Sequence, residues 1–210
     1  MTKKILVMCN EFGSAGALLS PVQKFIEDKK ADISVVCHGP AIDVFKSKNI
    51  KYNDLEHYGV KEANIDDANN IIKREEPDLV FTGFSQPPFF LEKYIIYLSK
   101  LNNLKSVSIL PGYSNSRKLV DGNNAGEEFM FMPNYILVLD ENAKNEMIEN
   151  GFGKDALIVT GQPYFDDLGR LRAGHSLEKT MEIKREEGID LDRYLILFAS
   201  QYLEDLARTD

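Results

Sequence analysis

The sequence has few of the residues that build disulfide scaffolds, metal sites or membrane spans. Its 210 residues include no tryptophan, two cysteines and three histidines. Two cysteines cannot form a disulfide framework or a four-thiolate zinc site, and the histidines show no metal-ligand spacing. No apolar run approaches the ~18 residues of a membrane span, and the apolar stretch at the N-terminus is too short for a signal peptide. We therefore expect a cytoplasmic chain without a metal site or a transmembrane segment, and leave peripheral membrane contact open.

Positive charge is also scarce. Lys and Arg number 25 against 33 Asp and Glu, so the formal net charge is −8 and the pI is near 5.0. Binding along a nucleic-acid backbone needs a concentrated basic face, so we expect no nucleic-acid partner. A small phosphorylated ligand stays compatible with this charge, because a few backbone N–H groups and one or two cations can bind it.

Two nucleotide and hydrolase motifs are missing as well. No Gly-Lys-Ser/Thr follows the first glycines, which argues against P-loop nucleotide hydrolysis. The chain also lacks the GxSxG elbow, and this excludes the hydrolases that depend on it.

Short apolar runs alternate with helical patterns from residue 5 to residue 160. This strict order requires crossover connections, because parallel neighbours cannot be joined by a tight turn. We therefore predict the fold class α/β, a Rossmann-like parallel sheet with helices on both faces. The expected strands are 5–8, 33–37, 79–82, 107–110, 136–139 and 157–160, with a weaker one at 50–53.

The chain changes character from Asp166 onward, where charged residues become frequent. We predict a helix over 176–187 and a buried-type strand over 194–200. This predicts two parts, an N-terminal domain over 1–168 and, over 169–210, a linker helix with the first strand of an incomplete second domain. The apolar face of an orphan strand needs cover, so a homodimer or a partner protein is expected to provide it.

Glycines and polar side chains follow several of the predicted strands. Ligands of open parallel sheets bind beyond the carboxyl ends of the strands, so these loops together favour a phosphorylated or polyhydroxylated ligand, although each alone could be an ordinary turn. Glu11 is the carboxylate immediately after the first strand, either a general base, a sugar-hydroxyl ligand or a solvated loop charge. The candidate binding residues are Gly13, Ser14, Gly16, His38, Ser85, Gln86, Gly112, Tyr113, Gly161 and Gln162.

Several stretches of the chain together resemble one known group of enzymes. Phe12–Gly16 is a glycine-rich first loop with Pro21 five residues after it, and Thr-Gly-Gln-Pro at 160–163 precedes Asp166. These features resemble the N-terminal domain of GT-B glycosyltransferases and of the related UDP-sugar 2-epimerases. The segments that carry the resemblance are 12–16 with Pro21, 33–39, 49–52, 133–141, 151–152 and 158–166.

The resemblance implies a two-domain enzyme whose N-terminal domain binds a glycan acceptor and whose C-terminal domain binds most of a nucleotide-sugar donor. It implies glycosyl transfer in polysaccharide or cell-surface glycan synthesis, with the nucleotide-sugar as substrate and neither a cofactor nor an obligatory metal. Many members have a histidine after the glycine loop, where this chain has Ala17, so Glu11 becomes the candidate catalytic base. The alternatives are a non-hydrolysing UDP-sugar 2-epimerase and a non-catalytic sugar-binding half that pairs with a separate donor-binding subunit.

Overall fold

The computed structural model describes residues 2–61, 63–84, 91–113, 116–196 and 198. The chain divides into two compact units, Met1–Asp167 and Leu168–Asp210. That the second unit opens a further domain stays a prediction. No helix among the described residues is both long and apolar enough to cross a membrane.

A single parallel sheet forms the centre of the first unit. Its six strands lie in the order β2-β1-β3-β4-β5-β6, and every neighbouring pair runs parallel. The predicted α/β class with a Rossmann-like sheet is confirmed. The strands are β1 (Lys3–Cys9), β2 (Ala31–Cys37), β3 (Leu79–Thr82), β4 (Lys105–Ile109), β5 (Tyr135–Val138) and β6 (Leu157–Val159).

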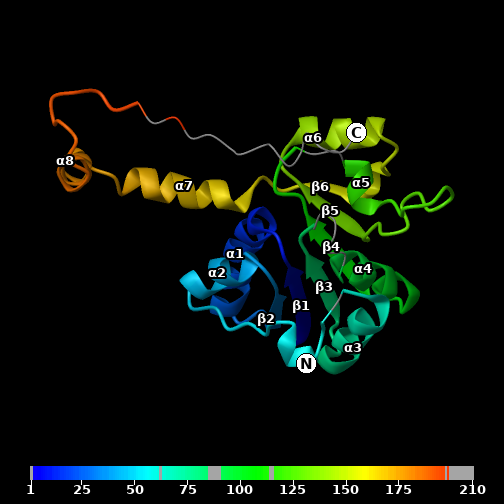
Figure 1. Ribbon diagram of the computed structural model, residues 1–210. Helices are drawn as coiled ribbons and strands as arrows, with labels where there is room; N and C mark the ends of the chain where they lie inside the picture. The colour runs from blue at the N-terminus through cyan, green and yellow to red at the C-terminus, as the bar shows by residue number, and fades with distance from the viewer. Residues whose placement is uncertain (1, 62, 85–90, 114–115, 197, 199–210) are drawn as a thin grey trace. The chain divides into compact units, whose positions relative to one another are not determined.

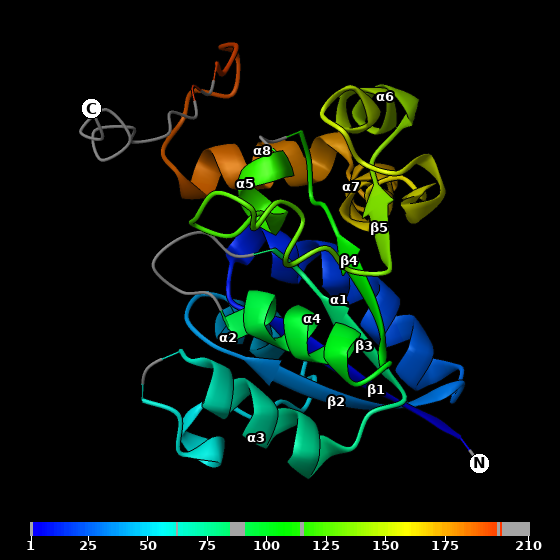
Figure 2. The ribbon, with the colours of Figure 1, turned by 90° about the vertical axis from the view of Figure 1, so that its right-hand side faces the viewer.

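Helices cover both faces of this sheet. Figures 1 and 2 show α1 and α2 on one face and α3 and α4 on the other. Two short 3₁₀ segments, η1 (Glu56–Tyr58) and η2 (Lys154–Ala156), lie between the larger elements. The helices that begin in the first unit are α1 (Phe12–Glu27), α2 (Ala41–Ser47), α3 (Ile65–Glu75), α4 (Leu91–Leu101), α5 (Ser116–Val120), α6 (Glu141–Glu149) and α7 (Pro163–Ala173).

The central strands are apolar on both sides because both sides are buried. Val7 of β1 packs in the core cluster under α1 and α2, whereas its neighbour Met8 packs in the cluster under α3 and α4. This explains why β1 reads as a continuous apolar run rather than an alternating one. A third cluster, which includes Ile136, Met147 and Leu157, fills the space between β5, β6 and α6.

The prediction of a strand over residues 50–53 is wrong. Only Asn53 pairs with β2, through an isolated parallel bridge to Val36. Asn49 adopts a left-handed conformation with φ of 56°, and Ile50 is buried in the core under α1 and α2. Among the described residues, this segment therefore pairs with the sheet edge only at Asn53, and the first half of β2 is paired on one side alone, with β1.

The second unit contains α8 (Leu177–Glu186). Ser176 caps this helix, since its side chain accepts a hydrogen bond from the backbone N–H of Lys179. None of the described residues of this unit is buried. The strand expected over 194–200 is absent where the structure describes it, because 194–196 and 198 have no strand beside them to complete a ladder. The other residues of that prediction lie outside the described ones.

A carboxylate at the end of α3 joins three elements of the first unit. The Tyr58 hydroxyl donates to Oε1 of Glu75 over 2.5 Å, and Lys4 Nζ lies 3.1 Å from Oε2. Burial by itself raises the pKa of Glu75, but hydrogen bonds from Tyr58 and Ser34 and the Lys4 ion pair together bring the pKa below its ordinary 4.5. The folded state therefore favours the ionised form.

We expect Glu75→Gln to lower the free energy of unfolding at pH 7 by about 1–2 kcal/mol. A lowered folded-state pKa gives stability that is present above the ordinary value of 4.5 and lost as the pH falls through the folded value. The gap between wild type and variant should therefore shrink from pH 7 to pH 3 in urea titrations. Glu76→Gln, at an exposed neighbour, is the control. An equal gap at both pH values would contradict this assignment.

Candidate functional site

The sheet order creates a switch point between β1 and β3. The chain passes from β1 to β2 on one side, and then returns across β1 to form β3 on the other side. In open parallel sheets the crevice at such a point, beyond the carboxyl ends of the strands, is where ligands bind. We call this end of the sheet the rim, meaning the loops that follow β1, β3, β4, β5 and β6.

The start of α1 lies at this switch point. Glu11 is its N-cap, and the Glu11 backbone carbonyl accepts the N–H of Ala15 over 2.9 Å. No side chain caps the helix, and its first turn contains no acidic residue. Gly13 is exposed. The first N–H groups of a 16-residue helix and its positive dipole end therefore stand at the crevice, in a form suited to an anionic group.

Ser14 fixes the loop after β3 to this helix start. Its buried hydroxyl donates to the Phe84 carbonyl over 2.9 Å and accepts from the Phe84 N–H over 3.2 Å. A Cβ placed on Gly83 would lie 2.2 Å from Ser14 Cβ, so only glycine permits this approach. The Ser14 hydroxyl is thus used within the protein and is not free to bind a ligand.

The loops after β4 and β6 join the same region. The Gln162 side-chain amide donates to the Pro111 carbonyl over 2.5 Å. Pro111 in turn faces α1, since a Cβ on Gly13 would lie 3.9 Å from Pro111 Cγ. Gly161 adopts a φ of 79°, which favours glycine. Three predicted binding residues, Gly13, Gly161 and Gln162, are therefore brought together around Pro111.

Tyr113 and Asp140 form a further contact on the rim. The Tyr113 hydroxyl donates to Asp140 Oδ2 over 2.5 Å, and Asp140 Oδ1 caps α6 by accepting the N–H of Ala143 over 2.8 Å. These two hydrogen bonds lower the pKa of Asp140, and the hydrogen bond to Asp140 raises the pKa of Tyr113. Aspartate is a preferred N-cap residue, which accounts for Asp140 at the start of α6, but nothing in the sequence indicates its contact with Tyr113.

The other predicted residues are more dispersed. His38 is exposed at the end of β2, where its backbone N–H donates to the Cys9 carbonyl over 3.3 Å. Gly16 lies inside α1 with open space around its Cα, and Gly112 lies between Pro111 and Tyr113. Ser85 and Gln86 lie outside the described residues.

The cysteines lie beneath the rim. Cys9 and Cys37 are register partners on β1 and β2, and both are free and buried. Burial raises the pKa of the Cys37 thiol to about 12 and also raises that of Cys9. Such thiols are poor nucleophiles and metal ligands. In the part of the chain that the structure describes, no cluster of histidine, cysteine and carboxylate groups could hold a metal ion.

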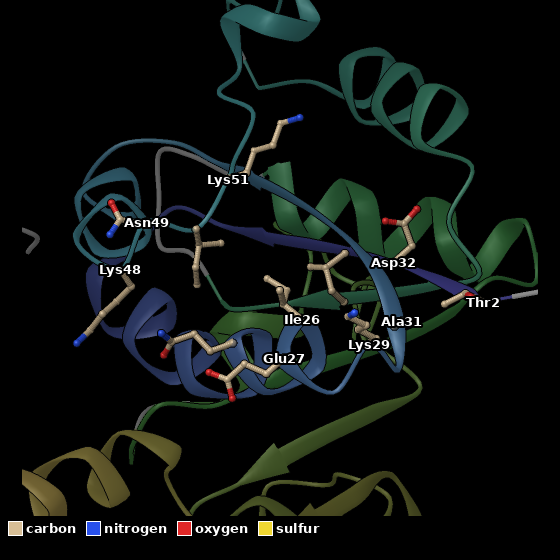
Figure 3. Close-up of a pocket in the computed structure, with 12 residues that line it drawn as sticks. Thr2, Ile26, Glu27, Lys29, Ala31, Asp32, Lys48, Asn49 and Lys51 are labelled. Carbon is tan, nitrogen blue, oxygen red and sulfur yellow. The ribbon is translucent and has the colours of Figure 1, made fainter.

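A separate hollow of about 850 Å³ lies away from the rim, at the start of β2. It is formed by the end of α1, the first residues of β2 and residues 48–51. Its lining mixes charges of both signs, and Figure 3 shows Lys48 and Lys51 pointing in different directions. These lysines do not converge on a common point, so the hollow does not form an anion site.

The fold of the first unit is found in solved enzyme structures. UDP-GlcNAc 2-epimerase from Neisseria meningitidis, solved with UDP-GlcNAc bound, is 16% identical with a TM-score of 0.61, over 86% of this chain and 53% of that chain. UDP-N-acetylglucosamine 2-epimerase from Rickettsia bellii is 14% identical with a TM-score of 0.59, over 90% and 52%. A glycosyltransferase from Rickettsia africae is 16% identical with a TM-score of 0.57, over 91% and 51%.

These likenesses confirm the predicted fold, which is that of the N-terminal domain of GT-B proteins. The chain spans about half the length of the structures that it matches. No protein-family model matches the sequence, and a search of curated proteins gave no match. At identities this low, the likeness establishes the fold and leaves the activity to be argued from the rim.

Proposed function

We propose that this chain is the acceptor-side half of a GT-B-type glycosyltransferase that uses a nucleotide-activated sugar in glycan synthesis. The observation that carries the proposal is the rim, where the uncapped start of α1 meets the loops after β3, β4 and β6. The backbone N–H groups of the first turn of α1, which contains no acidic residue, suit a phosphate, and the carboxylate of the N-cap residue Glu11 suits a sugar hydroxyl group. The likeness to enzymes named for nucleotide-sugars, the UDP-GlcNAc 2-epimerases from Neisseria meningitidis and Rickettsia bellii, supports the same ligand class.

Glycosyl transfer needs a base at the acceptor hydroxyl and fixed positive potential at the leaving phosphate. Glu11 is the candidate base, because its partly exposed carboxylate stands at the first residue of the α1 start. The N–H groups of α1 would supply part of the positive potential. Gly161 and Gln162 would shape the crevice through Pro111, and the remainder of the donor site would come from a second domain or subunit.

Binding and turnover test this proposal separately. Calorimetry of the 210-residue chain with UDP-, GDP- and CMP-sugars should show binding of one nucleotide class. Sugar release and transfer are then measured on the whole product of the coding frame. Absence of binding to every one of these compounds, with the fold intact by circular dichroism, would overturn the proposal.

A UDP-sugar 2-epimerase is the second candidate, favoured by the names of the matched structures from Neisseria and Rickettsia bellii. The two activities leave different products. Epimerisation of UDP-GlcNAc in deuterated water exchanges the proton at sugar C2, whereas glycosyl transfer leaves that proton in place. Incorporation of deuterium at C2 would therefore identify the protein as an epimerase and contradict the proposed glycosyltransferase.

A third reading is a sugar-binding half that works with a separate donor-binding subunit. Exposed apolar side chains in the second unit favour a covering protein or a second copy, since Tyr194, Ile196 and Phe198 are 100%, 90% and 86% exposed. Light scattering after gel filtration measures the molar mass in solution and so distinguishes a monomer from a homodimer or a complex with another protein. A stable monomer that transfers sugar unaided would contradict this reading.

A further inference from the structure

Tyr113 is an exposed aromatic residue on the rim. It follows β4, and its side chain reaches the N-cap of α6. The residue is 55% exposed, although its hydroxyl makes a short hydrogen bond. The hydroxyl is therefore used within the protein, while more than half of the residue's surface stays open to solvent.

The Tyr113 hydroxyl is held in place by a group that is itself held. Asp140 uses one carboxylate oxygen for Tyr113 and the other for the N–H of Ala143. If the Asp140 carboxylate moved together with the Tyr113 ring, it would lose its hydrogen bond to the N–H of Ala143, which caps α6. The raised pKa of Tyr113 and the lowered pKa of Asp140 keep a protonated donor facing an ionised acceptor.

The backbone that carries the ring is also fixed. The carbonyl of Pro111 accepts the Gln162 amide over 2.5 Å, and Pro111 faces Gly13 of α1. The backbone N–H of Leu110 donates to the Leu137 carbonyl over 2.9 Å. Leu110 and Pro111, which precede the tyrosine, are thus tied to β5, to α1 and to Gln162, and Asp140 holds the hydroxyl end of Tyr113. A restrained ring loses little conformational entropy when a ligand covers it.

The charges near the ring narrow the class of ligand. The Asp140 carboxylate contacts the hydroxyl, and Glu146 of α6 is close enough for its charge to raise the Tyr113 pKa. Two carboxylates at one edge of the ring repel a phosphate, whereas they can accept hydrogen bonds from neutral hydroxyl groups. A neutral, polyhydroxylated ring suits this place better than a charged group.

We infer that the Tyr113 ring is a stacking platform for the pyranose ring of the sugar substrate, with Asp140 as the positioning residue. A pyranose presents a face of C–H groups with partial positive charge, and the face of an aromatic ring is electron-rich. The phosphate would lie at the start of α1, and the sugar would lie over the loop after β4. This inference rests on the proposed function and assigns the sugar subsite within it.

Saturation-transfer NMR on the 210-residue chain tests the platform, with UDP-GlcNAc and UDP as probes. In the wild type we expect magnetisation transfer from the protein to be strongest for the protons on one face of the pyranose ring, the face that lies on Tyr113. Tyr113→Ala should weaken UDP-GlcNAc binding by about tenfold and leave UDP binding within about twofold. Tyr113→Phe retains the ring but loses the hydroxyl by which Asp140 positions it, so its UDP-GlcNAc binding should fall between that of the wild type and that of Tyr113→Ala, about threefold below the wild type.

Tyr135→Ala is the matched control, because Tyr135 is 41% exposed at the first residue of β5, the end of the strand away from the rim. It should bind both probes like the wild type. Equal binding of UDP-GlcNAc by Tyr113→Ala and wild type would overturn the platform alone. An equal loss for UDP and UDP-GlcNAc would overturn it too, since the ring would then stack on the base. Failure of the wild type to bind these probes and the GDP- and CMP-sugars as well would instead overturn the proposed function. If the wild type binds a GDP- or CMP-sugar, that compound and its free nucleotide replace the two probes.

Discussion

Replacement of Gly83 by alanine is expected to destabilise the first unit by about 3 kcal/mol, or to lower its Tm by about 10 °C. The new Cβ would lie 2.2 Å from Ser14 Cβ and 2.6 Å from Ser14 Oγ. Ser14 cannot swing aside, because it is buried and its hydroxyl holds both backbone polar groups of Phe84. The clash can be relieved only by moving the loop after β3 away from α1. Urea titrations with circular dichroism measure the effect.

A second glycine at the same helix start provides the control. Gly16 has nothing within 4 Å of the position of a Cβ, and it lies inside α1, where alanine is the better helix former. Gly16→Ala should therefore stabilise the chain by about 0.5–1 kcal/mol. Ser14→Gly, combined with Gly83→Ala, should cost less than the two changes measured separately, because the atoms that clash are gone. Additive losses would contradict the proposed clash.

The second large effect concerns Glu11. If Glu11 is the base of the proposed transfer, Glu11→Gln should lower kcat by about 100-fold or more and leave KM nearly unchanged. The fold should tolerate the change, since the helix uses the backbone carbonyl of Glu11 and not its side chain. Steady-state transfer assays on the whole product of the coding frame measure kcat, and thermal melting confirms that the variant is folded.

Glu27→Gln, at the last residue of the same helix, controls for a general loss of negative charge. It should retain kcat within about twofold. The role of Glu11 would be refuted by a Glu11→Gln enzyme that retains more than a third of the wild-type kcat. A rise in KM at constant kcat would instead make Glu11 a ligand of a sugar hydroxyl, which is the other role that its position allows.

The sheet was predictable because burial on both faces leaves a direct mark on the sequence. Val7 and Met8 are neighbours in the chain and belong to opposite cores, so β1 had to be apolar throughout. The segment at 50–53 lacks this mark, since Lys51 and Asn53 alternate with Ile50 and Tyr52, and Asn49 adopts a left-handed conformation directly before it. Residues 194–200 show a strand preference too, and preference alone cannot supply a neighbouring strand.

The site was predictable as a set of loops but not as a set of contacts. Glycines mark where the rim loops are, because turns and close approaches require them. The contacts that arrange the rim join residues far apart in the chain: Ser14 and Phe84 are 70 positions apart, Gln162 and Pro111 are 51, and Tyr113 and Asp140 are 27. No local pattern encodes such pairs. Asp140 is the clearest example. Its place before a helical segment explains its hydrogen bond to the N–H of Ala143, but nothing near it in the sequence indicates its hydrogen bond to Tyr113.

The rate at which the thiols of Cys9 on β1 and Cys37 on β2 react can measure transient opening of the folded protein. Cys9 and Cys37 are both 0% exposed and lie side by side in register, and burial keeps each as an unreactive thiol. Both thiols belong to the core under α1 and α2, so an alkylating reagent can reach them only when that core opens. Its rate of reaction with the native protein will report how often this happens, without any added label or engineered residue.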